Sequence, residues 1–309
     1  MSRKNVAPTP APLTIETRRL LEAIEAMGFP PFHEMTAPEA RAIRAESARL
    51  APAVVPEPVA QVRDLTLDGS AGPLPARMYT PAEWDPDSSG SLVYFHGGGW
   101  VLGNLDTHDV PCRGLANASS LRVVAIDYRL APEFPHPAAL DDAWAATQWV
   151  STSSRGALLV GGDSAGGHLA ANVAARARGS SVSVAGQFLV YPVTDLSRFD
   201  TASYHAYAEG YWLTRSAMEW FRGLYLPPDA DVTDPQVSPL LREDLTGMPP
   251  AVLVLAECDV LRDEGLAYGE RLRQAGCEVT TLEYTGVIHG FFAMPDAVPE
   301  GRAAIDQSG

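Results

Sequence analysis

A short glycine-rich segment around Ser164 constrains the fold of this chain more than any other feature. The segment, Gly161-Gly-Asp-Ser-Ala-Gly-Gly167, lies between an apolar run at 157–160 and an alanine-rich run at 168–177. The first run predicts a buried strand and the second a helix, so the segment holds a Gly-x-Ser-x-Gly pentad at a strand-to-helix turn. Such a turn is too tight for bulky neighbours, and it presents the serine hydroxyl beside the free N–H groups of a helix start. A glycine- and serine-rich loop that matches the pentad by coincidence is the alternative.

The composition of the chain excludes several kinds of partner. With 309 residues, 46% of them apolar, the chain can bury one large core or two unequal ones. Its formal net charge of -15 argues against nucleic acid and anionic membranes, because both bind basic surfaces. We find no apolar run long enough to span a bilayer and no signal-peptide core near the start of the sequence.

The three cysteines predict a reduced protein without a metal site. Cys112, Cys258 and Cys277 lack the spacing of metal ligands, so we expect free thiols and a cytoplasmic location. Cys258 adjoins a candidate catalytic residue, which would suit a reactive thiol, but a buried packing role is favoured because free cysteines are usually buried.

Strand-like and helix-like segments alternate along most of the chain. Helical periodicity at 14–27 and 37–50 follows a proline-rich lead, and a second proline-rich connector covers 51–58. The predicted strands are 61–67, 76–80, 92–95, 122–126, 157–160, 185–190, 251–255 and 278–283. The helical stretches among them are 106–118, 138–151, 164–178 and 263–275. Continuously apolar strands separated by helices predict an α/β fold with a mostly parallel sheet, and the first two strands, which lack an intervening helix, suggest an antiparallel edge.

An aromatic interval at 194–241 interrupts this alternation. Its aromatic residues are Phe199, Tyr204, Tyr207, Tyr211, Trp212, Trp220, Phe221 and Tyr225. An insertion of this length is either a lid over a site or a helical pair packed on the sheet edge. The aromatic side chains alone fit ordinary packing, whereas the position between two core strands favours a lid.

A serine nucleophile needs a base to take its proton and an acid to orient that base. Of the seven histidines, only His289 follows both Ser164 and a suitable acid. An ordinary surface-loop histidine is the alternative. Asp259 directly follows the buried strand at 251–255, so its carboxylate should point into the crevice at the carboxyl edge of the sheet. Three neighbouring carboxylates compete with it, namely Glu257, Asp263 and Glu264. The first should lie deeper on the same side, and the other two are typical of the first turn of a helix.

A glycine triplet after the strand at 92–95 predicts an oxyanion hole. Consecutive glycines present backbone N–H groups without obstruction by side chains. With the N–H of Ala165, those of Gly98 and Gly99 would form a three-donor cradle for the negative oxygen of a tetrahedral intermediate. A flexible turn or an anion-binding loop is the alternative. A nucleotide site is not indicated, because no Lys-Ser or Lys-Thr pair follows the glycines.

Five motifs occur in order between Leu92 and Met294. They are His96-Gly-Gly-Gly-Trp100, Asp127-Tyr-Arg-Leu-Ala-Pro-Glu133, Gly162-Asp-Ser-Ala-Gly-Gly167, Asp259-Val-Leu-Arg-Asp-Glu-Gly265 and Ile288-His-Gly-Phe291. Together they resemble the hormone-sensitive-lipase-like branch of the α/β-hydrolases, the bacterial family IV esterases. The resemblance implies an eight-stranded sheet, a core made of residues 56–193 and 242–309, and a helical cap made of 1–55 and 194–241. It also implies a serine esterase for short or medium acyl esters, and a homodimer formed through a sheet edge.

The expected reaction is acyl transfer from a small-molecule ester to Ser164, with no cofactor. We expect Trp100, Tyr211 and Trp212 to line the substrate pocket. Asp163 matches the family's residue before the nucleophile and would brace the site or contact substrate, with a plain turn carboxylate as the alternative. Amidase or formamidase activity on the same groups remains open. A receptor-like binding module is the other alternative, and the presence of the histidine that such receptors replace speaks against it.

Overall fold

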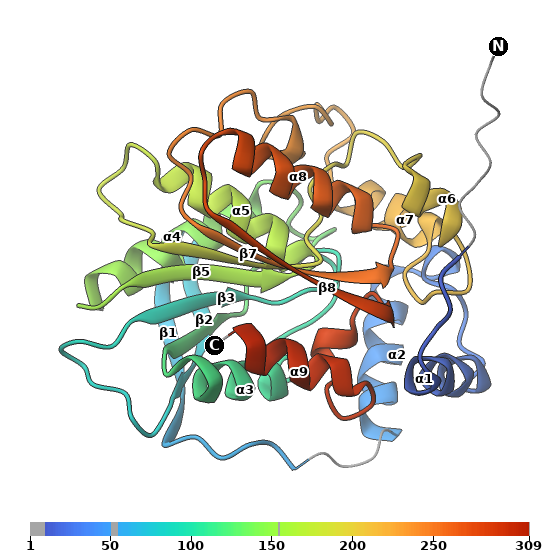
Figure 1. Ribbon diagram of the computed structural model, residues 1–309, viewed down its shortest axis with the longest axis horizontal. Coiled ribbons are helices and arrows are strands. Elements are labelled where there is room, and N and C mark those ends of the chain that lie inside the picture. Colours follow the sequence, from blue (N-terminus) through green and yellow to red (C-terminus); the bar gives the residue numbers. More distant parts are fainter. Residues whose placement is uncertain (1–9, 51–54, 154, 309) are drawn as a thin grey trace.

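Eight strands of the chain form one sheet (Figure 1). The computed structural model describes residues 10–50, 55–153 and 155–308, so most of the proline-rich lead and part of the 51–58 connector lie outside the described residues. The strands are β1 (Gln61–Gly69), β2 (Gly72–Thr80), β3 (Ser91–Phe95), β4 (Arg122–Ile126), β5 (Leu158–Asp163), β6 (Gly186–Val190), β7 (Ala251–Cys258) and β8 (Val279–Ile288). Their order is β1-β2-β4-β3-β5-β6-β7-β8, with the β1–β2 and β2–β4 pairs antiparallel and the others parallel. The predicted fold class and antiparallel edge are confirmed.

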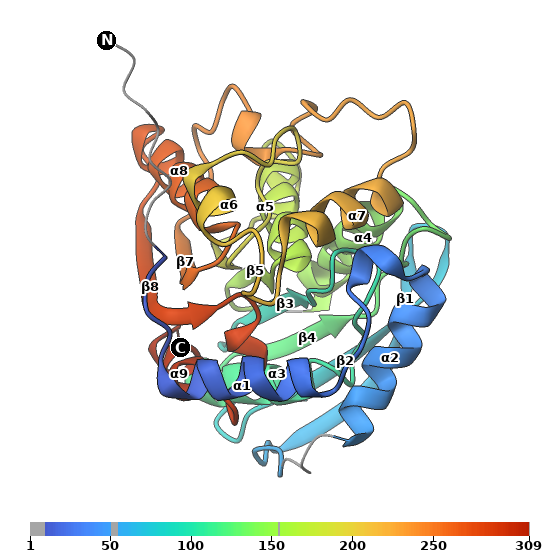
Figure 2. The ribbon, with the colours of Figure 1, turned by 90° about the vertical axis from the view of Figure 1, so that its right-hand side faces the viewer.

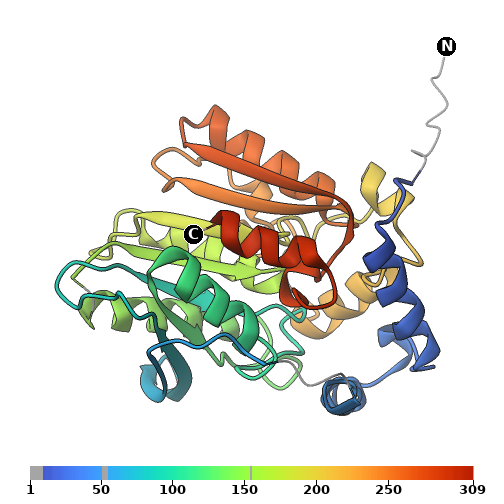
Figure 3. The same ribbon diagram turned by 60° about the horizontal axis from the view of Figure 1, so that its bottom comes forward.

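Helices cover both faces of this sheet. The α-helices of the described chain are α1 (Ile15–Ala26), α2 (Ala37–Leu50), α3 (Asp109–Ser119), α4 (Ala138–Ser153), α5 (Ala165–Ala177), α6 (Ala202–Ala206), α7 (Arg215–Tyr225), α8 (Arg262–Gln274) and α9 (Pro299–Ser308). Helices α3 and α9 pack together on one face, and α4, α5 and α8 lie on the other (Figure 3). In β3, Val93 and Phe95 belong to one buried cluster and Leu92 and Tyr94 to the other. Because both faces are covered, successive side chains of a strand are all buried, which explains the continuous apolar runs.

Helices from two distant parts of the sequence lie together beyond the carboxyl ends of the parallel strands. Figure 2 shows the turn between α1 and α2, from the first part of the chain, beside α7 of the aromatic interval. The ring of Trp220 in α7 stacks on Phe32, with 6.1 Å between centroids, and its Nε1–H donates to the carbonyl of Met35 at 3.1 Å. The interval therefore packs against the segment that leads into α2, above the strand ends. No helix in the described ranges combines the length and apolar character required to cross a membrane.

Strand β8 is longer than the sequence predicted. It continues to Ile288, although the predicted strand ended at residue 283. The register between β7 and β8 shifts near Glu257, whose Oε2 accepts the N–H of Gly286 at 2.8 Å. The φ of +66° at Gly286 fits a bulge at this point. Because the bulge lets pairing resume, the strand carries His289 to the edge of the sheet.

Candidate active site

Ser164 occupies the turn between β5 and α5. Its φ of 56° and ψ of -119° are a backbone conformation that residues with a side chain rarely adopt. The turn is fixed by the Ser164 N–H, which donates to the carbonyl of Val190 at 2.8 Å. A Cβ atom at either Gly162 or Gly166 would collide with the carbonyl oxygen of Phe95. The glycines on both sides of the serine are therefore required by the close approach of β3, as the tight turn predicted.

The structure brings Ser164, His289 and Asp259 together, although they are far apart in the sequence. His289 follows β8 and Asp259 follows β7, so both reach the carboxyl edge of the sheet beside the turn after β5. His289 Nε2 lies 2.9 Å from Ser164 Oγ, and His289 Nδ1 lies 2.7 Å from Asp259 Oδ2. All three residues are buried. This arrangement can move a proton from the hydroxyl to the imidazole while the carboxylate holds the ring.

The three competing carboxylates have other partners. The backbone N–H groups that they accept belong to Gly286 for Glu257, to Ser203 for Asp263, and to Thr194 and Asp195 for Glu264. Burial raises the pKa of Glu264 well above its ordinary value. The Glu257 contact stabilises the β7–β8 bulge, and the other two connect α8 to the start of the aromatic interval. These three carboxylates therefore have structural roles around Asp259.

The glycine loop after β3 places unbonded backbone N–H groups beside the cavity that contains Ser164. Gly98 has a φ of +115° and Gly99 a φ of +60°. A Cβ at Gly99 would collide with the ring of Phe221 in α7. Within the part of the chain that the structure describes, the N–H groups of Gly98, Gly99 and Ala165 have no hydrogen-bond acceptor. Free amides at a helix start and in a glycine loop can bind a developing negative charge.

Asp163 binds protein groups around the glycine loop. Its Oδ1 accepts the hydroxyl of Tyr94 at 2.8 Å and the N–H of Gly97 at 3.0 Å. His108 Nε2 lies 3.2 Å from the same oxygen. Burial would raise the pKa of Asp163, but His108 and Tyr94 outweigh it, so that the pKa is lowered. The Asp163 carboxylate lies in the cavity wall, and its hydrogen-bond partners are protein groups.

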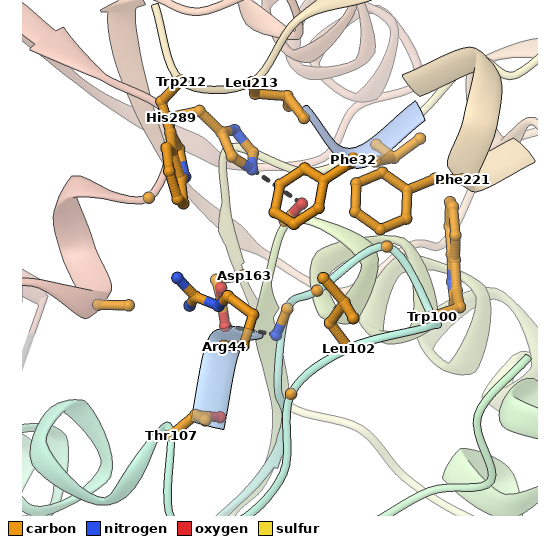
Figure 4. Close-up of a pocket in the computed structure, with 18 of the residues that line it drawn as sticks. Phe32, Arg44, Trp100, Leu102, Thr107, Asp163, Trp212, Leu213, Phe221 and His289 are labelled. Atoms are coloured by element: carbon orange, nitrogen blue, oxygen red, sulfur yellow. Dashed lines mark hydrogen bonds between the residues drawn. The ribbon is translucent and has the colours of Figure 1, made fainter. Parts of the chain in front are cut away.

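A cavity of about 140 Å³ opens beside Ser164 and His289 (Figure 4). Its apolar lining consists of Phe32, Trp100, Leu102, Val193, Trp212, Leu213, Met218, Phe221, Ala293 and Met294. Trp100 and Trp212 thus lie where a pocket wall was predicted. Tyr211 is not among the residues that line this cavity, so the structure does not bring it to the place where a pocket wall was predicted. The φ of +69° at Trp212 turns the chain so that neighbouring side chains diverge, and the Tyr211 ring packs edge-on against Tyr207 at 4.9 Å.

Many lining residues were not predicted as site residues from the sequence, among them Phe32, Arg44, Thr107 and His108. The first two come from the segment around α2, whose periodicity indicated only an amphipathic helix. His108 precedes Ser164, so chain order excluded it as the base, and its contact with Asp163 depends on tertiary structure. No local signal in the sequence marks these positions. Among the described residues, no group of three or more His, Cys, Asp or Glu side chains is arranged to hold a metal ion.

Comparisons with known proteins identify the family. A family model described as alpha/beta hydrolase fold matches residues 92–293. The chain is 39% identical over 293 residues to ethyl acetate hydrolase of Pseudomonas putida, covering 91% of this chain and 92% of that protein. It is 44% identical over 244 residues to carboxylic ester hydrolase LipN of Mycobacterium tuberculosis, covering 74% of this chain and 64% of that protein.

A solved structure agrees with these relatives along almost the whole chain. The ester-hydrolase EH1AB1 from the metagenome of Lake Arreo, complexed with a derivative of bipyridine phosphonate, has a TM-score of 0.91 and 42% identity to this chain. The match covers 96% of both chains. This chain therefore belongs to the hormone-sensitive-lipase-like branch of the α/β-hydrolase family, and it is a carboxylic ester hydrolase.

Proposed function

We propose that Ser164, His289 and Asp259 form the catalytic triad of this hydrolase. His289 Nε2 takes the proton of Ser164 Oγ as that oxygen attacks the ester carbonyl. The protonated imidazole then gives its proton to the departing alcohol, which leaves an acyl-enzyme. Water, deprotonated by the same imidazole, releases the acid, while Asp259 holds the Nδ1–H and stabilises the imidazolium. The observation that carries this proposal is the pair of contacts at 2.9 Å and 2.7 Å on the two sides of the imidazole.

In the same proposal, the N–H groups of Gly98, Gly99 and Ala165 form the oxyanion hole. This assignment is supported by the lack of an acceptor for all three N–H groups in the described structure. Gly98 and Gly99 line the cavity together with Ser164, and Ala165 follows Ser164 directly in the chain. Donors that are already in place need no reorganisation when the carbonyl oxygen becomes negative, and each contributes about 10²–10³-fold in rate.

We further propose that the substrates are esters with short acyl chains. The cavity of about 140 Å³ is close to the size that holds one benzene molecule in an engineered protein core. A relative that covers most of the chain carries the name ethyl acetate hydrolase. The helices of 1–55 and the interval 194–241 act in this proposal as a cap that closes the cavity, because Phe32, Trp212 and Phe221 all line it.

The proposal also covers the cellular location and the oligomeric state of the protein. Cys112, Cys258 and Cys277 are free, as thiols in a reducing compartment are, which supports a cytoplasmic location. Strand β8 forms one edge of the sheet, which supports a homodimer through that edge. Light scattering of the purified protein tests the dimer, and fractionation of cells tests the location.

Hydrolysis of p-nitrophenyl esters of increasing acyl length tests the triad and the chain-length proposal together. Wild type should show its highest kcat/KM with acetyl or butyryl esters, and Ser164→Ala should lose about 10⁴-fold or more in kcat. Ser181→Ala, at an exposed serine beyond the far end of α5, is the matched control and should retain full activity. Retention of ester turnover by Ser164→Ala would overturn the triad, and a preference for long chains would overturn the substrate class.

A fluorophosphonate probe gives an independent readout. It should label wild type at Ser164 and leave Ser164→Ala unlabelled, because only an activated serine is phosphonylated. An amide with the same acyl group as a good ester substrate should react far more slowly. If kcat/KM were equal for the amide and the ester, the proposed activity would be that of an amidase.

A further inference from the structure

Arg44 lies in the cavity without a partner for its charge. It comes from α2, and Figure 4 shows its side chain reaching into the cavity between Trp212 and Thr107. Within the described residues, its guanidinium has no hydrogen bond and no ion pair. The guanidinium lies near the ring of Trp212, with 5.7 Å between Cζ and the ring centroid. Among the described residues that line the cavity, no other is an arginine or a lysine.

The position of Arg44 is set by the residue one helical turn earlier. Arg41 donates from Nε to the carbonyl of Val101 at 2.9 Å, and from Nη2 to the carbonyl of Ala131 at 2.7 Å. It also forms a two-pronged ion pair with Glu133, at 2.8 and 2.7 Å. These contacts anchor α2 to the loop that follows the glycine triplet. Because residues three apart share one helix face, the same anchoring places Arg44 on the side of α2 that faces the cavity.

The carboxylate in the cavity wall does not pair with Arg44. Asp163 is occupied by Tyr94, Gly97 and His108. Desolvation by the surrounding protein atoms lowers the pKa of the Arg44 guanidinium from its ordinary value, with no compensating carboxylate. The side chain nevertheless remains charged at neutral pH and accessible to water. An unpaired, positioned guanidinium beside a catalytic serine is suited to bind a planar anion.

We propose that Arg44 is a subsite for a carboxylate carried by the substrate, so that the enzyme favours esters bearing a negative charge near the scissile bond. The inference rests on the proposed function of Ser164. The field of a chain with a net charge of -15 repels anions in general. A local cation in the cavity would offset that repulsion for the one substrate group that reaches it. The aromatic side of the cavity then accommodates the uncharged half of the ester.

Matched pairs of substrates test this proposal and tell the two halves of the ester apart. Monoethyl succinate and its amide, ethyl succinamate, differ only in the charge on the acyl half. Acetoxyacetate and acetoxyacetamide differ in the same way on the alcohol half. The measured quantity is the ratio of kcat/KM for the charged ester to kcat/KM for the neutral one, in wild type and in Arg44→Gln.

In one of the two pairs, Arg44→Gln should lower this ratio by about 10- to 100-fold, the effect of losing one charge-assisted hydrogen-bonding contact. Hydrolysis of the neutral ester should stay within about twofold of wild type. Arg44→Lys should retain part of the preference, because it keeps the charge but not the planar fork. Arg155→Gln removes an exposed arginine from the amino end of β5 and should leave both ratios unchanged.

Two results would overturn the subsite. One is an unchanged ratio in both pairs. The other is an equal loss on charged and neutral esters, which would mean that Arg44 only supports Trp212. Neither result would contradict the proposed triad, because labelling of Ser164 and hydrolysis of the neutral esters by wild type test the triad independently.

Discussion

The carboxylate of Asp163 accepts the backbone N–H of Gly97 at 3.0 Å, and this contact joins the residue before Ser164 to the first glycine of the loop that carries the free amides. The nucleophile turn and the proposed oxyanion donors are therefore parts of one hydrogen-bonded unit. His108 and Tyr94 complete the unit through their own contacts with the same carboxylate. A change at Asp163 should act on the position of Gly98 and Gly99, without touching the nucleophile.

Asp163→Asn should lower kcat by about tenfold with little change in KM, which is less than the 10²–10³-fold cost of removing a donor outright. Asparagine keeps an acceptor for Gly97 but loses the charge that pairs with His108. The displaced amides of the loop matter mainly in the transition state. Steady-state kinetics on a short-chain ester measure the effect. Tyr94→Phe removes one donor and should cost less, and a kcat for Asp163→Asn equal to wild type would show that the unit does not position the loop.

A second prediction concerns the contact between Gly99 and the cap. Gly99→Ala places a Cβ into the ring of Phe221, in addition to a positive φ that alanine adopts at a cost of about 1 kcal/mol. The loop must shift, so kcat should fall by about 10²-fold, comparable to the loss of one oxyanion donor. The double variant Gly99→Ala/Phe221→Ala makes room for the methyl group and should recover a substantial part of kcat. Failure of the second substitution to restore any activity would mean that the collision is not the cause.

Much of this architecture could be predicted because the relevant signals are local. The apolar runs located all eight strands to within a few residues, and chain order singled out His289 among seven histidines. The path of β8 was missed, since the bulge depends on a hydrogen bond between Glu257 and Gly286 that no local pattern encodes. Arg44 was missed for the same reason. Its unpaired state depends on where α2 is anchored against a loop about 60 residues away in the chain.

The contacts of Asp259 and Glu257 predict opposite outcomes for two similar substitutions. Asp259→Asn should lower kcat by about 10⁴-fold, because an amide at this position favours the wrong tautomer of His289. Glu257→Gln keeps an acceptor for the N–H of Gly286 and should leave kcat within about threefold of wild type. Kinetics of both variants with one ester, alongside circular dichroism, measure the difference. A large loss in Glu257→Gln with a small one in Asp259→Asn would exchange the proposed roles of the two carboxylates.

The last prediction concerns His168, a buried histidine that the proposed mechanism does not use. Its Nε2 lies 3.2 Å from the carbonyl of Val237, its Nδ1 has no partner in the described structure, and the edge of its ring meets Trp100. Burial lowers the pKa of His168 to about 3. Between this value and the ordinary pKa of about 6.5, the unfolded chain binds a proton that the folded protein does not. Stability is therefore greatest above the unfolded pKa and is lost as the pH falls.

The size of this effect follows from the same linkage. Between about pH 7.5 and about pH 5.5, His168 should account for a loss of about 1.4 kcal/mol in the free energy of unfolding. Urea unfolding of wild type and His168→Gln at both pH values isolates this contribution, because the variant has no proton to bind. The variant should be less stable than wild type at the higher pH, yet lose less stability on acidification. His205→Gln, which removes an exposed histidine, should follow wild type. If His168→Gln lost as much stability as wild type over this interval, the folded protein would be accepting the proton at His168, and the buried imidazole would not be held neutral.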